Sequence, residues 1–419
     1  MAASLGASAV AAQAPSPAAC HADLCFAGAL APFFARLRAS RPGDGAPIHI
    51  LQIGDSHTAG DMITSGWRTR LQARYGAGGR GVLAAGRPYK GYLTWGVTAT
   101  QSPGWSVNGT FGAAYRPAYP DAAPPLGLSG FTQTANEAGE TLGLTADTPD
   151  QDFDRITVCA VARPGGGTLL LKMGTAERRW TLAAPRRVPV CRTLDSDAPV
   201  AAASLTTMDS GTVSIASFAT FRREGGAILS NLGVSGSQLA QFGRTGDDML
   251  RAEFAAYRPD LIVLAFGTNE GFSPTLSPDS YEAGLRAAVA RIRRLAGPVP
   301  ILLLGAPDAA TRQEALEGAD CGDGWHVPHG LGEVRARQQA VARQLGLGFW
   351  NWSAAMGGLC ASSRWALAGW MRGDHVHFTR DGGDRIGAMI DADLERAAEN
   401  APESAPESQA RPDPEDRTS

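Results

Sequence analysis

Apolar residues fall into two patterns that alternate along this chain. Short, largely apolar runs bounded by turn residues indicate buried strands, and longer segments with apolar residues every three or four positions indicate amphipathic helices. Strands are predicted in this way at residues 48–53, 261–266, 300–304 and 347–352, and helices at 58–75, 280–296, 331–345 and 383–397. Buried strands that show no polar–apolar alternation and that take turns with helices along the chain predict a parallel sheet covered by helices on both faces.

This alternation stops between residues 98 and 225. The segment is rich in Pro, Gly and Thr, and short strand-like runs separated by turn residues occur at 156–161, 168–173, 179–183 and 212–221. Such spacing predicts an antiparallel, sandwich-like β-rich insert. We therefore divide the chain into an N-terminal segment (1–40), a first α/β part (41–97), the β-rich insert (98–225), a second α/β part (226–397) and a disordered, acidic, Pro-rich tail (398–419).

Composition narrows the range of functions. The 419 residues are 44% hydrophobic and 19% charged with a net charge of −3, which is typical of a globular protein. A balance this close to neutral offers no electrostatic footprint for nucleic acid. No stretch approaches the roughly 20 apolar residues of a membrane-spanning helix, so none is expected. Residues 1–14, rich in Ala and Ser, are interpreted as the end of a secretory signal or as a disordered tail.

The cysteines suggest a compartment. They lie as three pairs that are close in sequence, Cys20 with Cys25, Cys159 with Cys191, and Cys321 with Cys360. An even number in this arrangement suggests disulfides and an oxidising compartment such as the periplasm, although the sequence leaves the connectivity open. The alternative for the last pair is a zinc site that also uses His326 and His329.

Ser56 is a candidate nucleophile. It lies in the run Ile-Gly-Asp-Ser-His, where the first predicted strand ends and a helix begins. In α/β sheets ligands bind beyond the carboxyl ends of the strands. A helix N-terminus also supplies N–H groups and partial positive charge, which stabilise the oxyanion formed when an ester carbonyl is attacked. The competing interpretation is that Asp55 or Ser56 only caps the helix.

A nucleophilic serine requires a base and a group that orients the base. Asp374 precedes His377 by three positions in the run Gly-Asp-His-Val-His-Phe-Thr. That spacing allows one loop or helical turn to carry both groups, with the carboxylate within reach of the imidazole Nδ1–H. His375 is the competing candidate, but because it is adjacent to Asp374 the two side chains should point apart.

Two further positions could stabilise an oxyanion. Asn269, in the run Gly-Thr-Asn-Glu, follows the strand predicted at 261–266 and should lie on the same rim as Ser56. Gly236, in the run Gly-Val-Ser-Gly-Ser, offers an unhindered backbone N–H. Each of these motifs alone would usually mark only a turn.

Taken together and in this order, the four motifs resemble the SGNH (GDSL-like) hydrolase superfamily. Its motifs are a serine in a Gly-Asp-Ser block, a glycine, an asparagine in Gly-x-Asn, and Asp-x-x-His. The resemblance implies a three-layer α/β/α sandwich, with Ser56 as nucleophile, Asp374 as orienting acid and His377 as base. It also implies an oxyanion hole formed by Ser56, Gly236 and Asn269, and no metal or organic cofactor.

Some features point to a group within the superfamily. The run Gly-Asp-Ser-His-Thr-Ala-Gly-Asp from Gly54, the run Gly-Thr-Asn-Glu, and the β-rich insertion between the first two blocks resemble the peptidoglycan O-acetylesterases of Gram-negative bacteria. There the insertion is a carbohydrate-binding-module-like domain. His57 replaces the Leu of the Gly-Asp-Ser-Leu motif, and Glu270 replaces the Asp that commonly follows the Asn of the third motif. Neither change removes a catalytic atom.

The resemblance implies a serine esterase that removes acetyl groups from the C6 hydroxyl of N-acetylmuramic acid in peptidoglycan, in the periplasm or outside the cell. Alternatives are a sugar O-acetyltransferase, an esterase on another acetylated polysaccharide, and a non-catalytic glycan-binding protein. Trp365 and Trp370, close in sequence to His377, are the tryptophans predicted to stack on sugar rings.

Overall fold

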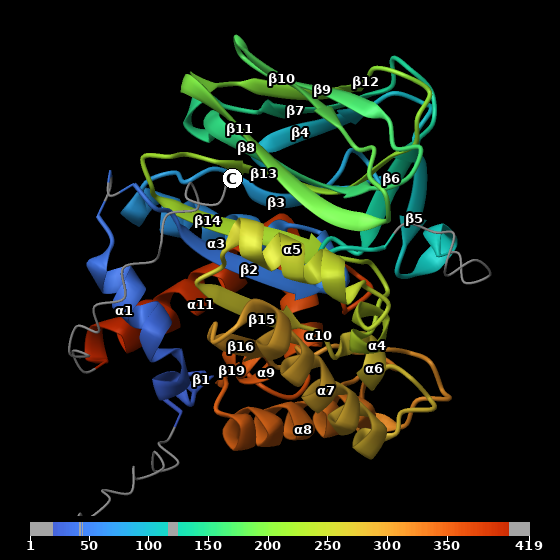
Figure 1. Ribbon diagram of the computed structural model, residues 1–419. Coiled ribbons are helices and arrows are strands. Elements are labelled where there is room, and N and C mark those ends of the chain that lie inside the picture. The colour runs from blue at the N-terminus through green and yellow to red at the C-terminus, as the bar shows by residue number, and fades with distance from the viewer. Residues whose placement is uncertain (1–19, 42, 44, 116–124, 402–419) are drawn as a thin grey trace, which may run out of the picture.

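The computed structural model describes residues 20–41, 43, 45–115 and 125–401 (Figure 1). Its main sheet has the strand order β1-β19-β16-β15-β2-β14. Its strands are β1 (Leu24–Cys25), β2 (Ile48–Gly54), β14 (Ala227–Gly233), β15 (Leu261–Ala265), β16 (Ile301–Leu304) and β19 (Gly348–Trp350). Neighbouring strands run parallel except β1, which pairs antiparallel with β19.

Helices cover both faces of this sheet. One face carries α1 (Ala31–Ala39), α3 (Met62–Tyr75) and α11 (Arg380–Asn400), and the other carries α5 (Asp247–Tyr257), α7 (Pro278–Ala296) and α8 (His329–Leu345). Side chains of β2 point alternately into the two cores, with Ile50 on the first face and Leu51 on the second. This period of two, with both faces buried, explains why the strand is largely apolar and does not alternate between apolar and polar residues. The predicted three-layer α/β/α arrangement with a parallel sheet is confirmed.

The insert is built from two antiparallel sheets that enclose a separate apolar core, as Figure 1 shows above the main sheet. One sheet has the order β10-β9-β12-β7-β4 and the other β11-β8-β13-β6-β5. The strands are β4 (Val97–Gln101), β5 (Ser106–Gly109), β6 (Phe131–Ala135), β7 (Thr141–Ala146), β8 (Phe153–Ala162), β9 (Thr168–Met173), β10 (Ala176–Thr181), β11 (Val188–Val200), β12 (Ala202–Thr207) and β13 (Val213–Phe221). A further strand, β3 (Gly81–Ala84), precedes the predicted boundary at residue 98 but pairs with β13.

The helix predicted at 58–75 is interrupted. The structure has a short α2 (Ser56–Ala59), a break at Gly60 and Asp61, and then α3. Asp61 adopts a left-handed backbone (φ 51°), and its buried carboxylate binds the guanidinium groups of Arg68 at 3.1 Å and Arg80 at 2.9 Å. The break therefore turns an acidic side chain inward, where two buried cations compensate its charge.

Shorter elements complete the α/β part. They are α4 (Leu239–Phe242), α6 (Thr268–Gly271), α9 (Trp352–Ala355), α10 (Ala361–Leu367), β17 (Gly318–Asp320), β18 (His326–Pro328) and the 3-10 helices Ala27–Leu30, Gly112–Ala114 and Pro149–Gln151. The N-terminal segment contributes β1 and α1 to this part, an assignment that the sequence pattern does not predict. The interpretations of residues 1–14 and of the tail beyond 401 lie outside the described residues.

The cysteines form the three disulfides Cys20–Cys25, Cys159–Cys191 and Cys321–Cys360. Because Cys321 and Cys360 bind each other, the alternative zinc site with His326 and His329 is wrong. Within the part of the chain that the structure describes, no helix has the length and apolar character needed to cross a membrane.

Candidate active site

Three of the predicted motifs meet at one edge of the main sheet. The last residues of β14, β2 and β15 are in register, with Gly54 paired to Gly233 on one side and to Ala265 on the other. Ser56 follows β2 after one residue, and Gly236 and Asn269 follow the other two strands. The carboxyl ends of adjacent parallel strands thus bring these residues to a common rim, as the sequence predicted for Ser56 and Asn269.

Close backbone contacts at this rim require glycine. A Cβ atom on Gly54 would lie 2.3 Å from Oγ1 of Thr58, and one on Gly233 would lie 2.1 Å from the backbone nitrogen of Ala59. These distances are far shorter than van der Waals contact, so a side chain at either position would push α2 away from the strand ends. The two glycines therefore hold the helix of Ser56 against the sheet.

Ser56, His377 and Asp374 form a hydrogen-bonded row. The hydroxyl of Ser56 lies 3.0 Å from Nε2 of His377, and Nδ1 of His377 lies 2.8 Å from Oδ2 of Asp374. The other oxygen of Asp374 accepts the backbone N–H groups of Val376 at 3.0 Å and of His377 at 2.9 Å. One loop thus carries both acid and imidazole, in the spacing that the sequence indicated.

The charge on Asp374 favours one tautomer of His377. Partial burial acts to raise the pKa of Asp374, but the hydrogen bonds from two backbone N–H groups and from the ring outweigh it and lower the pKa. Asp374 is therefore a carboxylate at neutral pH and fixes the proton of His377 on Nδ1. The lone pair of Nε2 then faces the hydroxyl of Ser56, as general-base catalysis requires.

Gly236 lies in a tight turn beside this row. The N–H of Ser237 donates to the carbonyl of Val234 at 3.0 Å, and Gly236 is the third residue of the turn with φ 77°. Glycine suits this left-handed position, and the hydrogen bond that closes the turn leaves the N–H of Gly236 unused. Asn269 is tied to the same turn, because its side-chain amide donates to the carbonyl of Ser237 at 2.9 Å.

Glu270, the residue after Asn269, has a structural contact of its own. Its Oε1 accepts the backbone N–H of Leu239 at 2.7 Å, which joins α6 to the start of α4. Burial raises the pKa of Glu270 to about 7. Glu270, which replaces the usual Asp, therefore has a side chain long enough to place its carboxyl group against α4.

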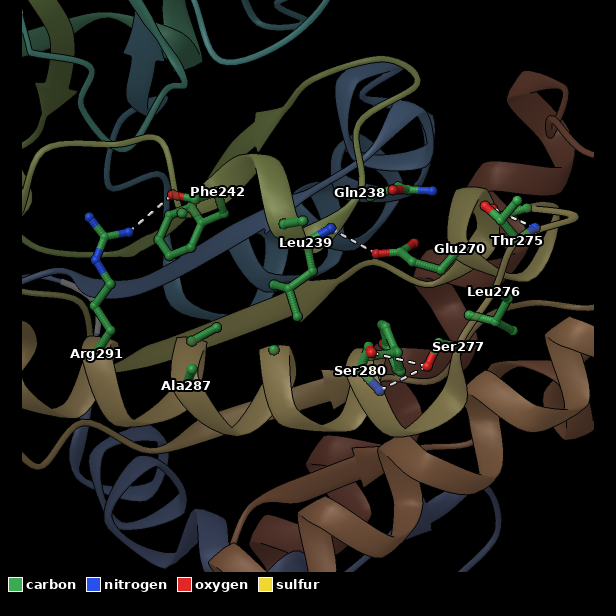
Figure 2. Close-up of a pocket in the computed structure, with 16 residues that line it drawn as sticks. Gln238, Leu239, Phe242, Glu270, Thr275, Leu276, Ser277, Ser280, Ala287 and Arg291 are labelled. Atoms are coloured by element: carbon green, nitrogen blue, oxygen red, sulfur yellow. Dashed lines mark hydrogen bonds between the residues drawn. The ribbon is translucent and has the colours of Figure 1, made fainter. Parts of the chain in front are cut away.

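A cavity of about 620 Å³ lies next to this contact, between α4, α6 and α7. Figure 2 shows Leu239 and Phe242 on one wall, Glu270 at one end, and Ala287 and Arg291 on the opposite helix. The residues of the hydrogen-bonded row do not line it. The cavity is therefore a neighbour of the site and not the place where Ser56 would meet an ester.

Two other sequence candidates are placed elsewhere. His375 has a left-handed backbone (φ 55°), its ring stacks on Trp325 with centroids 3.7 Å apart, and its Nδ1 lies 3.1 Å from the hydroxyl of Ser363. The competing base is thus bound away from Ser56. The prediction for Trp365 is wrong, because this indole is 5% exposed and belongs to the core beneath α11.

Trp370 is more exposed than Trp365, but it does not offer a free ring. The guanidinium of Arg385 lies 3.8 Å from the ring centroid of Trp370. Its ring also meets that of Trp365 edge-on, with centroids 5.2 Å apart. A sugar could stack on this face of Trp370 only by displacing the arginine.

Phe111 is an aromatic residue at the site that the sequence does not indicate. It belongs to the insert, is 36% exposed, and its ring lies 3.0 Å from the position of a Cβ on Gly236. Arg244 holds this loop by donating to the carbonyl of Thr110 at 2.7 Å and by packing 4.0 Å from the ring of Tyr115. The insert thus supplies an apolar face next to a predicted oxyanion donor.

Comparisons with known proteins indicate the fold and the class of protein. Residues 209–385 match the GDSL-like Lipase/Acylhydrolase family. A solved structure entitled "Peptidoglycan O-acetylesterase in action, 5 min" has a TM-score of 0.74 and 27% identity, covering 90% of this chain and 98% of that one. No curated protein matches the sequence.

Two other solved structures are more distant. A putative GDSL-like lipase from Parabacteroides merdae has a TM-score of 0.30 and 18% identity, covering 42% of this chain and 74% of its own. A family two carbohydrate esterase from Clostridium thermocellum has a TM-score of 0.28 and 12% identity, covering 70% of this chain and 98% of its own.

The fold, the match of residues 209–385 to a GDSL-like family model and the similarity to a solved esterase together define the class of protein: the chain is a carboxylic ester hydrolase with an SGNH-like fold. Within that class it is similar, over nine-tenths of its length and therefore including much of the insert, to a solved peptidoglycan O-acetylesterase.

Proposed function

We propose that this protein is a serine esterase that removes O-acetyl groups from a cell-envelope polysaccharide, namely the 6-O-acetyl group of N-acetylmuramic acid in peptidoglycan. The observation that carries the proposal is the hydrogen-bonded row of Ser56, His377 and Asp374. It lies in a chain that resembles a peptidoglycan O-acetylesterase across both of its parts.

In the first half-reaction, Nε2 of His377 takes the proton of Ser56 as its Oγ attacks the acetyl carbonyl carbon. The carbonyl oxygen becomes an oxyanion and accepts hydrogen bonds from the N–H groups of Ser56 and Gly236. Asn269 donates only one amide hydrogen to Ser237, which leaves the second for the oxyanion. His377 then protonates the C6 oxygen of the sugar, the C–O bond breaks, and an acetyl-enzyme remains.

Water completes the cycle. His377 takes a proton from a water molecule while the water oxygen attacks the acetyl carbon on Ser56. The N–H groups of Ser56 and Gly236 and the amide of Asn269 stabilise the second oxyanion. The bond to Oγ breaks, Oγ recovers the proton from His377, and acetate leaves. These steps call on no metal or organic cofactor.

The surroundings of the row suit a polymer. The side chains of His377 and Asp374 are 39% and 46% exposed, so an ester on a long glycan strand could approach without being enclosed. Phe111 offers an aromatic face of the kind on which sugar rings pack. Three disulfides support a location in an oxidising compartment, the periplasm or the outside of the cell.

Acetate release from O-acetylated peptidoglycan and from acetylated xylan tests the proposal. We expect the native protein to prefer peptidoglycan and the Ser56→Ala variant to release no acetate from either. Faster turnover of xylan would assign another polysaccharide, and faster transfer to an added glycan acceptor than to water would make the protein an O-acetyltransferase. Binding of peptidoglycan by the native protein without turnover would leave only a glycan-binding role.

A further inference from the structure

His57 lies directly beneath the catalytic row, and the mechanism above gives it no part. Its side chain is only 2% exposed. The ring packs 5.6 Å from that of His377 at an interplanar angle of 31°, and the rings of Trp352 and Phe378 enclose it at 5.3 Å and 5.6 Å. A histidine enclosed in this way must satisfy both ring nitrogens with partners from the protein.

Both nitrogens of His57 face hydrogen-bond acceptors. Nε2 lies 2.9 Å from the carbonyl oxygen of Val376, a group that can only accept. Nδ1 lies 3.2 Å from Oδ1 of Asp55, an oxygen that also accepts the backbone N–H of His57 at 2.9 Å. A neutral imidazole has one donor and one acceptor nitrogen, so it would set a lone pair against one of these oxygens. An imidazolium donates to both.

The charges around the ring agree with this protonation state. Burial disfavours the cation, but the carboxylate of Asp55, the two hydrogen bonds and the more distant Asp374 outweigh it, and the pKa of His57 is raised. His377 is the other titratable ring that packs against His57. Glu270 lies near Asp55, and burial raises the pKa of Glu270 to about 7, so it adds little negative charge below neutral pH.

His57 forms a hydrogen bond with the middle of the loop that carries Asp374 and His377. Val376 lies between the acid and the base, its N–H donates to Asp374 at 3.0 Å, and its carbonyl accepts from His57. His57 itself directly follows Ser56 in the chain. A single side chain therefore connects the segment of the nucleophile to the loop that carries the other two members of the row.

We propose that His57 is a positioning residue: a buried imidazolium, paired with Asp55, that holds the Val376 carbonyl and so fixes the Asp374–His377 loop against the helix of Ser56. The proposal rests on the proposed function for its catalytic consequence, but not for the protonation state.

Nuclear magnetic resonance tests the protonation state without reference to activity. The full-length protein is labelled with ¹⁵N in its seven histidine rings and studied at pH 8. We expect one histidine with protons on both ring nitrogens, whose signals disappear in His57→Leu and persist in the control His329→Gln, which alters an exposed histidine at the start of α8. A His57 ring with one unprotonated nitrogen would overturn the proposal, whatever the enzyme hydrolyses.

Kinetics with p-nitrophenyl acetate test the positioning role. Because a hydrogen bond from a charged group is lost, His57→Leu should lower kcat about 10- to 100-fold and leave KM within about twofold. His57→Gln, which keeps a donor but no charge, should recover part of the lost kcat.

Circular dichroism establishes that both variants are folded, and His329→Gln should match the native enzyme in every kinetic respect. Native kcat in His57→Leu, or no recovery of kcat in His57→Gln relative to His57→Leu, would contradict the positioning role. Activity that survives in Ser56→Ala would instead contradict the proposed function and leave the result for the ring protons intact.

Discussion

Replacing Glu253 with Gln should stabilise the protein at pH 8 far more than at pH 5. Glu253 lies on α5 and is fully buried where this helix meets the insert. The hydroxyl of Ser217, on β13, donates to its Oε1, and the backbone N–H of Leu128 donates to Oε2 at 2.6 Å. The carboxyl group therefore holds the two parts of the chain together through contacts with two segments of the insert.

The magnitude follows from the pKa of Glu253. Burial raises this pKa from 4.5 to about 7, against the hydrogen bonds from Ser217 and Leu128 that lower it. Between these values the folded state binds more protons than the unfolded state, so the free energy of unfolding falls as pH rises from about 4.5 to 7 and stays low above that. Over the interval between the two pKa values, the free energy of unfolding falls by about 3 kcal/mol, at ~1.4 kcal/mol per pH unit. The Gln side chain does not ionise, so the variant does not lose this stability as pH rises.

Urea denaturation at pH 5 and pH 8 measures the effect. The difference in unfolding free energy between Glu253→Gln and the native protein should increase by about 2 to 3 kcal/mol from the lower to the higher pH. A control variant, Glu314→Gln, changes an exposed carboxyl and should show no such increase. A difference for Glu253→Gln that is equal at both pH values, or smaller at pH 8, would refute the reasoning.

Three further predictions concern the site and its support. Asp374→Asn should lower kcat for a chromogenic acetate about 10³-fold or more, because the amide no longer stabilises the protonated His377, while the melting temperature changes little; near-native turnover would contradict this. Replacing Cys321 and Cys360 with Ser should lower the free energy of unfolding by about 4 kcal/mol, since their disulfide joins residues 39 apart, and an unchanged urea midpoint would count against that role. Phe111→Ala should raise KM for O-acetylated peptidoglycan but not for p-nitrophenyl acetate, and an equal effect on both substrates would show that its ring does not contact the glycan.

The parallel sheet can be predicted because its strands are buried on both faces. β15 and β16 read as continuous apolar runs and β2 as a largely apolar run with two separate polar residues, and their predicted bounds differ from the structure by one residue. The sequence does not predict β14 as a strand, because two adjacent polar residues, Ser230 and Asn231, divide its apolar run. Both polar side chains are buried, Ser230 against His49 and Asn231 against Arg80, and such long-range pairing leaves no local pattern.

The same distinction applies to the site. Ser56, Asp374 and His377 lie in short motifs whose residue types and local spacing predict their shared chemistry from the sequence alone. Phe111 reaches Gly236 across more than a hundred residues, and nothing in the sequence of the insert marks that contact. Trp365 shows the converse, because closeness in sequence to the histidine loop does not reveal that the ring points into the core.

Detection of an acetyl-enzyme tests the central claim most directly. The protein is mixed with p-nitrophenyl acetate, quenched in acid during turnover, and digested for peptide mass spectrometry. We expect an acetyl group on Ser56 of the native protein during turnover, and neither adduct nor turnover in Ser56→Ala. An acetyl group on another residue in the native protein, together with persistent turnover by Ser56→Ala, would contradict the assignment of Ser56 as the nucleophile.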